Sequence, residues 1–142
     1  MIGMTILQPV VMLLAWTMVM WVWMYATRIP AMAAAGMDAA RMVGSTGASL
    51  REQLPDPVSW KADNYNHLHE APTLFYAVAI VLAIIGEGDG TASLVAWAYV
   101  ALRIAHSIVQ ATVNRVVVRF ALFALSSLAL MVLIGQAAVA VF

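Results

Sequence analysis

Four long, mostly apolar segments separated by short polar stretches constrain this chain more than any other feature. We expect helices over residues 4–26, 59–85, 91–111 and 116–141. About 20 predominantly apolar residues suffice for a helix to cross a bilayer. The chain is 64% hydrophobic and 10% charged, whereas a soluble domain carries roughly a quarter charged residues. The sequence therefore predicts an all-α integral membrane four-helix bundle, with a single domain over residues 1–142.

Aromatic residues gather in the second half of the first segment, as is typical of a helix that reaches a membrane surface. They are Trp16, Trp21, Trp23 and Tyr25. Residues 31–43 also favour helix, so we expect this helix to continue beyond the surface. A cleaved signal peptide is the competing interpretation, because small residues follow at 31–35. The long apolar run and the absence of a basic N-terminal region favour a retained first span.

Polar side chains share one face at the start of the second helix. Asp63, Asn66, His67 and Glu70 are spaced at i, i+3, i+4 and i+7, which stacks them on one side of a helix. Pro72 lies inside the same predicted helix and removes a backbone donor, so we expect a kink there. Within a membrane, such groups need partners in the protein or in a wet cavity.

A second polar stripe follows the third helix and continues to the start of the fourth. Its members are Tyr99, Arg103, His106, Gln110 and Asn114, followed by Arg115 and Arg119. In an antiparallel bundle, both stripes converge at one end. Arg103 lies deeper than the other cations, and Glu70 is its natural counter-ion because either charge buried alone would be costly. We therefore predict a structural ion pair between Glu70 and Arg103.

Plainer interpretations of these residues remain open. The polar groups would then only join helices, and Arg115 and Arg119 would extend toward lipid headgroups. A metal site built from His67, Glu70 and His106 is a weak alternative, because two ligands at i, i+3 plus one from another helix is an unspecific pattern. We expect no metal. The chain has no cysteine, which excludes disulfides, thiolate ligands and a cysteine nucleophile.

The positions of the basic residues predict the orientation in the membrane. They lie around the first and third loops, at Arg28, Arg41, Arg51, Lys61, Arg115 and Arg119. The second loop and both chain ends carry none. The positive-inside rule then places the first and third loops in the cytoplasm. We expect a multi-pass protein of the plasma (inner) membrane with both termini non-cytoplasmic. The formal net charge of zero argues against a nucleic-acid partner.

Two short motifs point to a known family. The segment from His67 to Pro72 is similar to a helix-two signature of Asn-x-x-Glu followed by proline, with His67 in place of the asparagine. Leu102-Arg103-Ile104-Ala105-His106 is similar to the Arg-Val-Ala-His of prostaglandin E synthases. With four helices and a long first loop, nearly the whole chain resembles the MAPEG family, the membrane-associated proteins of eicosanoid and glutathione metabolism, as a bacterial-type member.

This resemblance implies a homotrimer with glutathione bound between neighbouring subunits near the cytoplasmic face. Arg119 takes the position of the family arginine thought to activate glutathione, and Glu70 and His106 are implied glutathione contacts. Two departures stand out, because Asn66 replaces an arginine and Gln110 replaces a tyrosine that help to hold glutathione. The candidate glutathione-binding residues are thus Glu70, His106, Arg115, Asn66, His67 and Gln110, with Arg119 as the catalytic candidate.

Two functions follow from the resemblance and the pattern. The first is a membrane-embedded, glutathione-dependent transferase or peroxidase-like protein that acts on hydrophobic electrophiles entering from the lipid bilayer. The second is a non-catalytic membrane protein of the same fold that binds a lipid or a protein partner. Binding of glutathione near Arg119 separates the two.

Overall fold

The computed structural model describes residues 1–142, and every regular element in it is a helix. The elements are α1 (Leu7–Ala34), the short 3-10 helix η1 (Ala39–Arg41), α2 (Gly47–Arg51), α3 (Asp56–His67), α4 (Ala71–Ile84), α5 (Thr91–Ala111) and α6 (Val116–Val141). Four helical stretches are long and apolar enough to cross a membrane, with α3 and α4 together forming one of them. The all-α, four-span architecture predicted from the sequence is confirmed.

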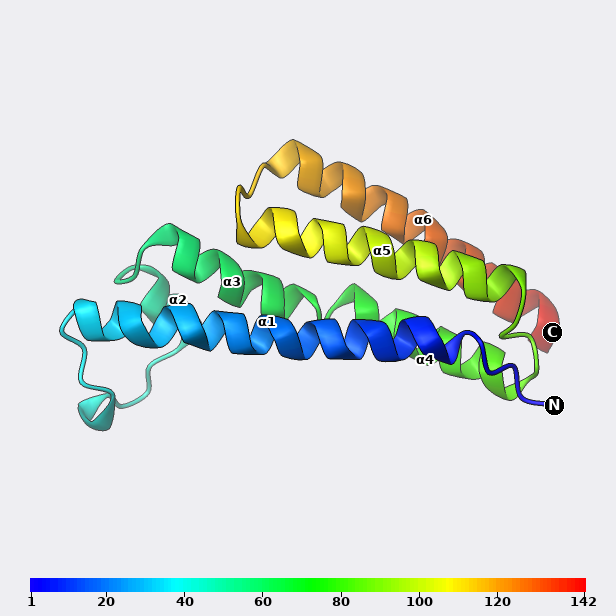
Figure 1. The fold of residues 1–142 in the computed structure, drawn as a ribbon, viewed down its shortest axis with the longest axis horizontal. Coiled ribbons are helices and arrows are strands. Elements are labelled where there is room, and N and C mark those ends of the chain that lie inside the picture. The colour runs from blue at the N-terminus through cyan, green and yellow to red at the C-terminus, as the bar shows by residue number, and fades with distance from the viewer.

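The spans lie lengthwise beside one another, and both chain termini lie at the same end of the molecule (Figure 1). α5 and α6 pack closely along their length, α6 also contacts α4, and α1 packs against α3, α4 and α5. At the opposite end, the first loop with η1 and α2 extends beyond the α5–α6 connection (Figure 1). The bundle therefore has a compact end at the termini and a protruding, more polar end.

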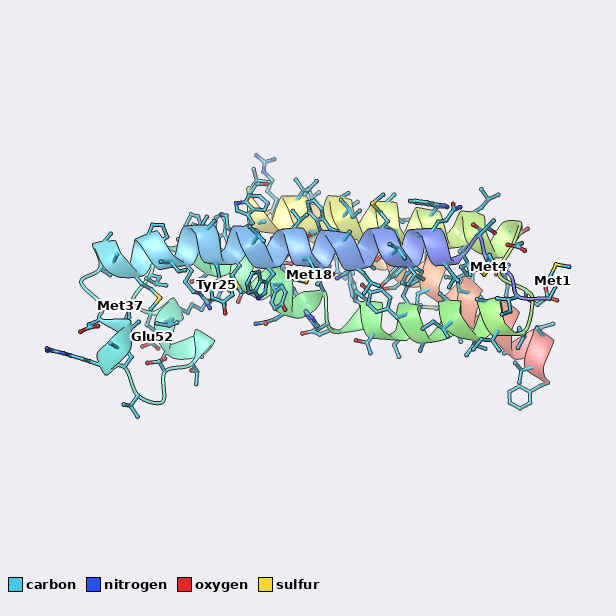
Figure 2. All side chains as sticks on the ribbon, turned by 60° about the horizontal axis from the view of Figure 1, so that its bottom comes forward. Met1, Met4, Met18, Tyr25, Met37 and Glu52 are labelled. Atoms are coloured by element: carbon cyan, nitrogen blue, oxygen red, sulfur yellow. The ribbon has the colours of Figure 1, made fainter.

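The core lies between α1, α4 and α5. Phe75 of α4 stacks on Tyr99 of α5 with ring centroids 4.5 Å apart, and both side chains are buried. The outward faces of α1 and α6 instead carry exposed apolar side chains, and Met18, about half-way along α1 in Figure 2, is one of them. Such faces suit contact with lipid tails, because the bilayer core is as apolar as they are.

The bounds of α5 and α6 agree with the predicted helices, whereas the first two helices differ. α1 ends at Ala34, and Gly36 follows with a left-handed φ of 72°. The predicted continuation of this helix beyond residue 26 is therefore confirmed as far as Ala34, whereas residues 35–43 do not belong to it. A single 3-10 turn forms beyond it, where the Asp38 carboxylate accepts a hydrogen bond from the Ala40 N–H at 3.1 Å.

The second span is broken rather than kinked. α3 ends at His67, α4 begins at Ala71, and the residues between them do not continue either helix. Pro72 lies in the first turn of α4, where its missing N–H would have no intrahelical acceptor. The predicted kink at Pro72 is thus replaced by a new helix start, and Glu70 becomes the residue that precedes it.

The residues before α1 are fastened to the α4–α5 turn in what we call the N-terminal clasp, formed by Gly3, Thr5, Ala83, Gly88 and Asp89. The Gly3 N–H donates to the Ala83 carbonyl at 2.8 Å. The Thr5 N–H donates to Asp89 Oδ1 at 2.9 Å, and the Thr5 hydroxyl donates to the same oxygen. The backbones of Gly3 and Gly88 touch, so a Cβ at either position would collide with the other.

Candidate functional site

A cavity of about 300 Å³ opens at the break between α3 and α4. Its walls come from the end of α3, the start of α4, the second half of α5 and the first turns of α6. They are formed by His67, Glu70, Ala71, Arg103, His106, Val116, Arg119, Phe120 and Phe123. This volume is at the lower end of the roughly 300–1,000 Å³ of small-molecule sites. We refer to it below as the cationic cavity.

Arg103 is the most buried cation of the cationic cavity, with 2% of its surface exposed. Its Nη2 donates to the His67 carbonyl at 3.4 Å, and its buried Nε has no partner. The predicted ion pair with Glu70 is absent, since the ion pairs of the chain join Arg41 to Asp38 and Arg51 to Asp63. The helix break explains this difference, because it takes Glu70 off the face of α3 and leaves it exposed.

Arg119 lies one turn into α6 and is half-buried. Its Nη1 donates to Asn114 Oδ1 at 2.6 Å, while its buried Nε has no partner. No carboxylate forms an ion pair with it. Arg115, by contrast, is exposed and does not line the cationic cavity. The structure thus places one of the two predicted α6 arginines in the cavity.

The two cavity histidines have different environments. His67 Nδ1 lies 2.9–3.1 Å from the side-chain amide of Gln110, which is itself 2% exposed. Gln110 therefore hydrogen-bonds to His67 on the side away from the cavity and does not line the cavity itself. His106 is 5% exposed, and its buried Nδ1 has no partner. The structure contains no group of three or more histidine, aspartate or glutamate side chains placed to hold a metal ion.

Asn66, the remaining candidate, is exposed and lies in a separate polar hollow. That hollow lies among α1, α2 and α3 and includes Arg28, Arg51 and Asp63. Of the predicted site residues, the cationic cavity thus brings together Glu70, His67, His106, Arg119 and Arg103. It does not include Asn66, Gln110 or Arg115.

The apolar wall of the cavity is not among the features predicted from the sequence. Val116, Phe120 and Phe123 recur at i, i+4 and i+7, a spacing that places them on one face of α6. The same face carries Arg119, so this periodicity was the available signal. The pattern is hard to recognise in the sequence, because nearly every residue of α6 is apolar and no polar face marks the opposite side of the helix.

The cavity combines excess positive charge with an apolar surface. Two guanidinium groups and two imidazoles surround it, and Glu70 is its single carboxylate. Unpaired donors in a half-buried site favour an anionic ligand, because buried charges without partners are costly. The Val116–Phe120–Phe123 wall favours an apolar group beside that anion.

The fold and the cavity together define a four-span helical membrane protein with a cationic, partly apolar site near one end of its bundle. The family model of the MAPEG family matches residues 6–139. The chain therefore belongs to the MAPEG family, which confirms the resemblance found in its motifs. No curated protein and no solved structure matches the chain at a significant level.

Proposed function

We propose that this protein is a membrane-embedded, glutathione-dependent transferase or peroxidase-like enzyme that acts on hydrophobic electrophiles. Membership of the MAPEG family supports a glutathione-related membrane function. The observation that carries the proposal is the convergence of Arg103 and Arg119 on one cavity, with no carboxylate paired to either guanidinium.

The chemistry of the cavity residues fits glutathione. This tripeptide carries two carboxylates, one ammonium group and one thiol. Arg103 and Arg119 each have a buried Nε without a partner, so both retain capacity to donate to carboxylates or to a thiolate. Glu70 is unpaired as well, and its carboxylate suits an ammonium group. Both signs of charge in the ligand thus find a counterpart in the cavity.

Arg119 is the residue that we assign to thiol activation. Bound glutathione supplies a thiol whose sulfur is a nucleophile when deprotonated, and a free thiol of this kind has a pKa of about 8.5. A nearby guanidinium stabilises the thiolate and does not lose its own proton. Two unit charges 4 Å apart interact by about 1 kcal/mol in water and about 4 kcal/mol near a protein surface. The half-buried position of Arg119 therefore strengthens its effect on the thiol pKa.

The apolar wall indicates the kind of second substrate. Phe120 and Phe123 line the cavity and also expose a large part of their surface on the outside of α6. A hydrophobic electrophile dissolved in the bilayer could reach the cavity along this face without crossing water. This arrangement supports an apolar substrate and explains why such an enzyme would lie in a membrane.

The test is a glutathione titration of the detergent-purified protein by calorimetry, followed by a pH titration of thiolate absorbance in the complex. We expect binding at millimolar glutathione or below, and a bound thiol with a pKa lower than that of free glutathione. Arg119→Leu should abolish this pKa shift. Arg41→Leu, which changes an exposed arginine of η1, should not affect it.

Two outcomes would contradict the enzyme hypothesis. One is the absence of binding by the wild type at millimolar glutathione, and the other is a bound thiol that titrates as free glutathione does. Either would favour the second function, a non-catalytic membrane protein that binds a lipid or a protein partner. The replacement of two family glutathione contacts by Asn66 and Gln110 is the observation that supports this alternative.

A further inference from the structure

We infer that Asn114 is a positioning residue for Arg119, an inference that rests on the proposed role of Arg119. Asn114 Oδ1 accepts from Arg119 Nη1 at 2.6 Å, which is the one side-chain hydrogen bond that this guanidinium makes within the chain. Arginine side chains have several rotatable bonds, and those near helix ends in a membrane extend toward the headgroups. The bond to Asn114 instead retains the Arg119 guanidinium at the cationic cavity.

The backbone explains why an asparagine stands at this corner. Asn114 lies between α5 and α6 and has a φ of 49°, the single positive φ among the non-glycine residues of the chain. Its N–H donates to the Val109 carbonyl at 2.7 Å and so closes the end of α5. Of the residues with side chains, asparagine and aspartate enter this left-handed region most readily, and glycine enters it without cost.

The three residues that suit the corner would act differently on Arg119. Glycine offers no acceptor, so the guanidinium would be released. Aspartate would hold the guanidinium by an ion pair, and its negative charge would offset the field that Arg119 exerts on a thiolate. Asparagine holds the guanidinium with a neutral oxygen and leaves its charge uncompensated. Asparagine thus suits position 114 for two reasons: it tolerates the left-handed backbone there, and it holds Arg119 without neutralising its charge.

The first test does not depend on glutathione. Phenylglyoxal modifies accessible arginines, and peptide mass spectrometry measures the rate at each position. In Asn114→Gly, Arg119 should react about tenfold faster than in the wild type, the factor for one lost hydrogen bond of about 1.4 kcal/mol. In Asn114→Asp it should react more slowly than in the wild type. Arg41, with 88% of its side chain exposed, is the internal control and should react equally in all three proteins.

The second test measures the thiol pKa of bound glutathione in the same proteins. Both variants should raise this pKa toward that of free glutathione, Asn114→Gly by releasing Arg119 and Asn114→Asp by offsetting its charge. A merely structural role for Asn114 would not give opposite changes in labelling with the same change in thiol pKa. Circular dichroism should show equal helix content, since both variants suit the left-handed corner.

The two tests separate failure of this inference from failure of the proposed function. Equal labelling of Arg119 in the wild type and in Asn114→Gly would overturn the role of Asn114, whether or not glutathione binds. Absence of glutathione binding by the wild type would overturn the proposed function alone. Faster labelling in Asn114→Gly would then still support Asn114 as the residue that holds Arg119.

Discussion

Ser107 joins three helices through one buried hydroxyl oxygen. The indole N–H of Trp16 in α1 donates to this oxygen at 2.9 Å, and the Asn64 amide in α3 donates to it as well. From the sequence, Trp16 is expected only to lie in an interfacial aromatic belt. The structure gives both Trp16 and Ser107 a place inside the bundle, as a polar link that fixes α1 and α3 against α5.

We expect Ser107→Ala to destabilise the protein by about 1–3 kcal/mol, because the buried Asn64 amide and the half-buried Trp16 indole would lose their acceptor. Thermal unfolding in a mild detergent, followed by circular dichroism, measures the effect. Ser45→Ala is the matched control, since Ser45 is exposed and its side chain makes no hydrogen bond. Equal unfolding temperatures for the wild type and Ser107→Ala would contradict the role of this link.

Asp89 gives the N-terminal clasp a dependence on pH. Hydrogen bonds from the side chain and the N–H of Thr5 hold the pKa of Asp89 below its usual value of about 3.9. The stability that these bonds provide is therefore present above that usual value and is lost as the pH falls through the lowered pKa. The unfolding temperatures of wild type and Asp89→Asn should differ most near neutral pH and converge below about pH 4. A constant difference down to pH 3 would contradict this prediction.

The break between α3 and α4 is the element-scale feature that shapes the cavity. It frees Glu70 from the face of α3 and places His67 at a helix end, where its carbonyl can accept from Arg103. A continuous helix would stack Asp63, Asn66, His67 and Glu70 as the sequence predicted. The break instead separates Asn66 from Glu70, which line different hollows.

Pro72 lies in the first turn of α4, where a proline costs little stability, so its replacement should also have little effect. We expect Pro72→Ala to change the free energy of unfolding by about 1 kcal/mol or less. Ala77→Pro, in the interior of α4, should instead cost about 3 kcal/mol or more, because it removes a helical hydrogen bond and crowds the preceding turn. A loss for Pro72→Ala as large as that for Ala77→Pro would mean that Pro72 has a further structural role.

Helix boundaries were predicted correctly from the sequence where a clear turn or polar corner precedes the helix. α5 and α6 follow a glycine-rich turn and a polar Asn-Arg corner respectively, so their starts were evident. The break at 68–70 was missed because no glycine or proline lies within it. Glu70 does not share the face of Asp63 in the structure, since helix spacing locates a side chain only while the helix is continuous. Gln110 was predicted to bind glutathione, because nothing in the sequence indicates that its side chain contacts His67 instead.

The distribution of basic residues still predicts how the protein is oriented in the membrane. The structure places both termini at one end (Figure 1) and the first loop, with Met37 and Glu52, at the other (Figure 2). From the positive-inside rule we predict that the loop end faces the cytoplasm. A C-terminal alkaline phosphatase fusion should therefore be active in the periplasm. A fluorescent C-terminal GFP fusion would contradict this orientation, because GFP fluoresces after folding in the cytoplasm.

Assembly into a homotrimer stays a prediction, and the exposed surface of the chain is compatible with it. Ala98 and Ala101 are exposed on α5 and would allow another helix to approach closely, as small residues do in membranes. Native mass spectrometry from several mild detergents should show a mass three times that of the 15.3 kDa chain. Monomers in every detergent would count against the trimer.

The N-terminal clasp also has a consequence for the order of events during synthesis. Thr5 and Asp89 are 84 residues apart in the chain, so at about 5–20 residues per second the partner of Thr5 emerges roughly 4–17 s after it. Ser107, the partner of Trp16, emerges later still. Until α3 (Asp56–His67) follows it, α1 must stay in the bilayer on its own hydrophobicity, and the clasp forms later still. The long apolar run of α1 thus anchors the nascent chain at a stage when none of its later helices has yet been made.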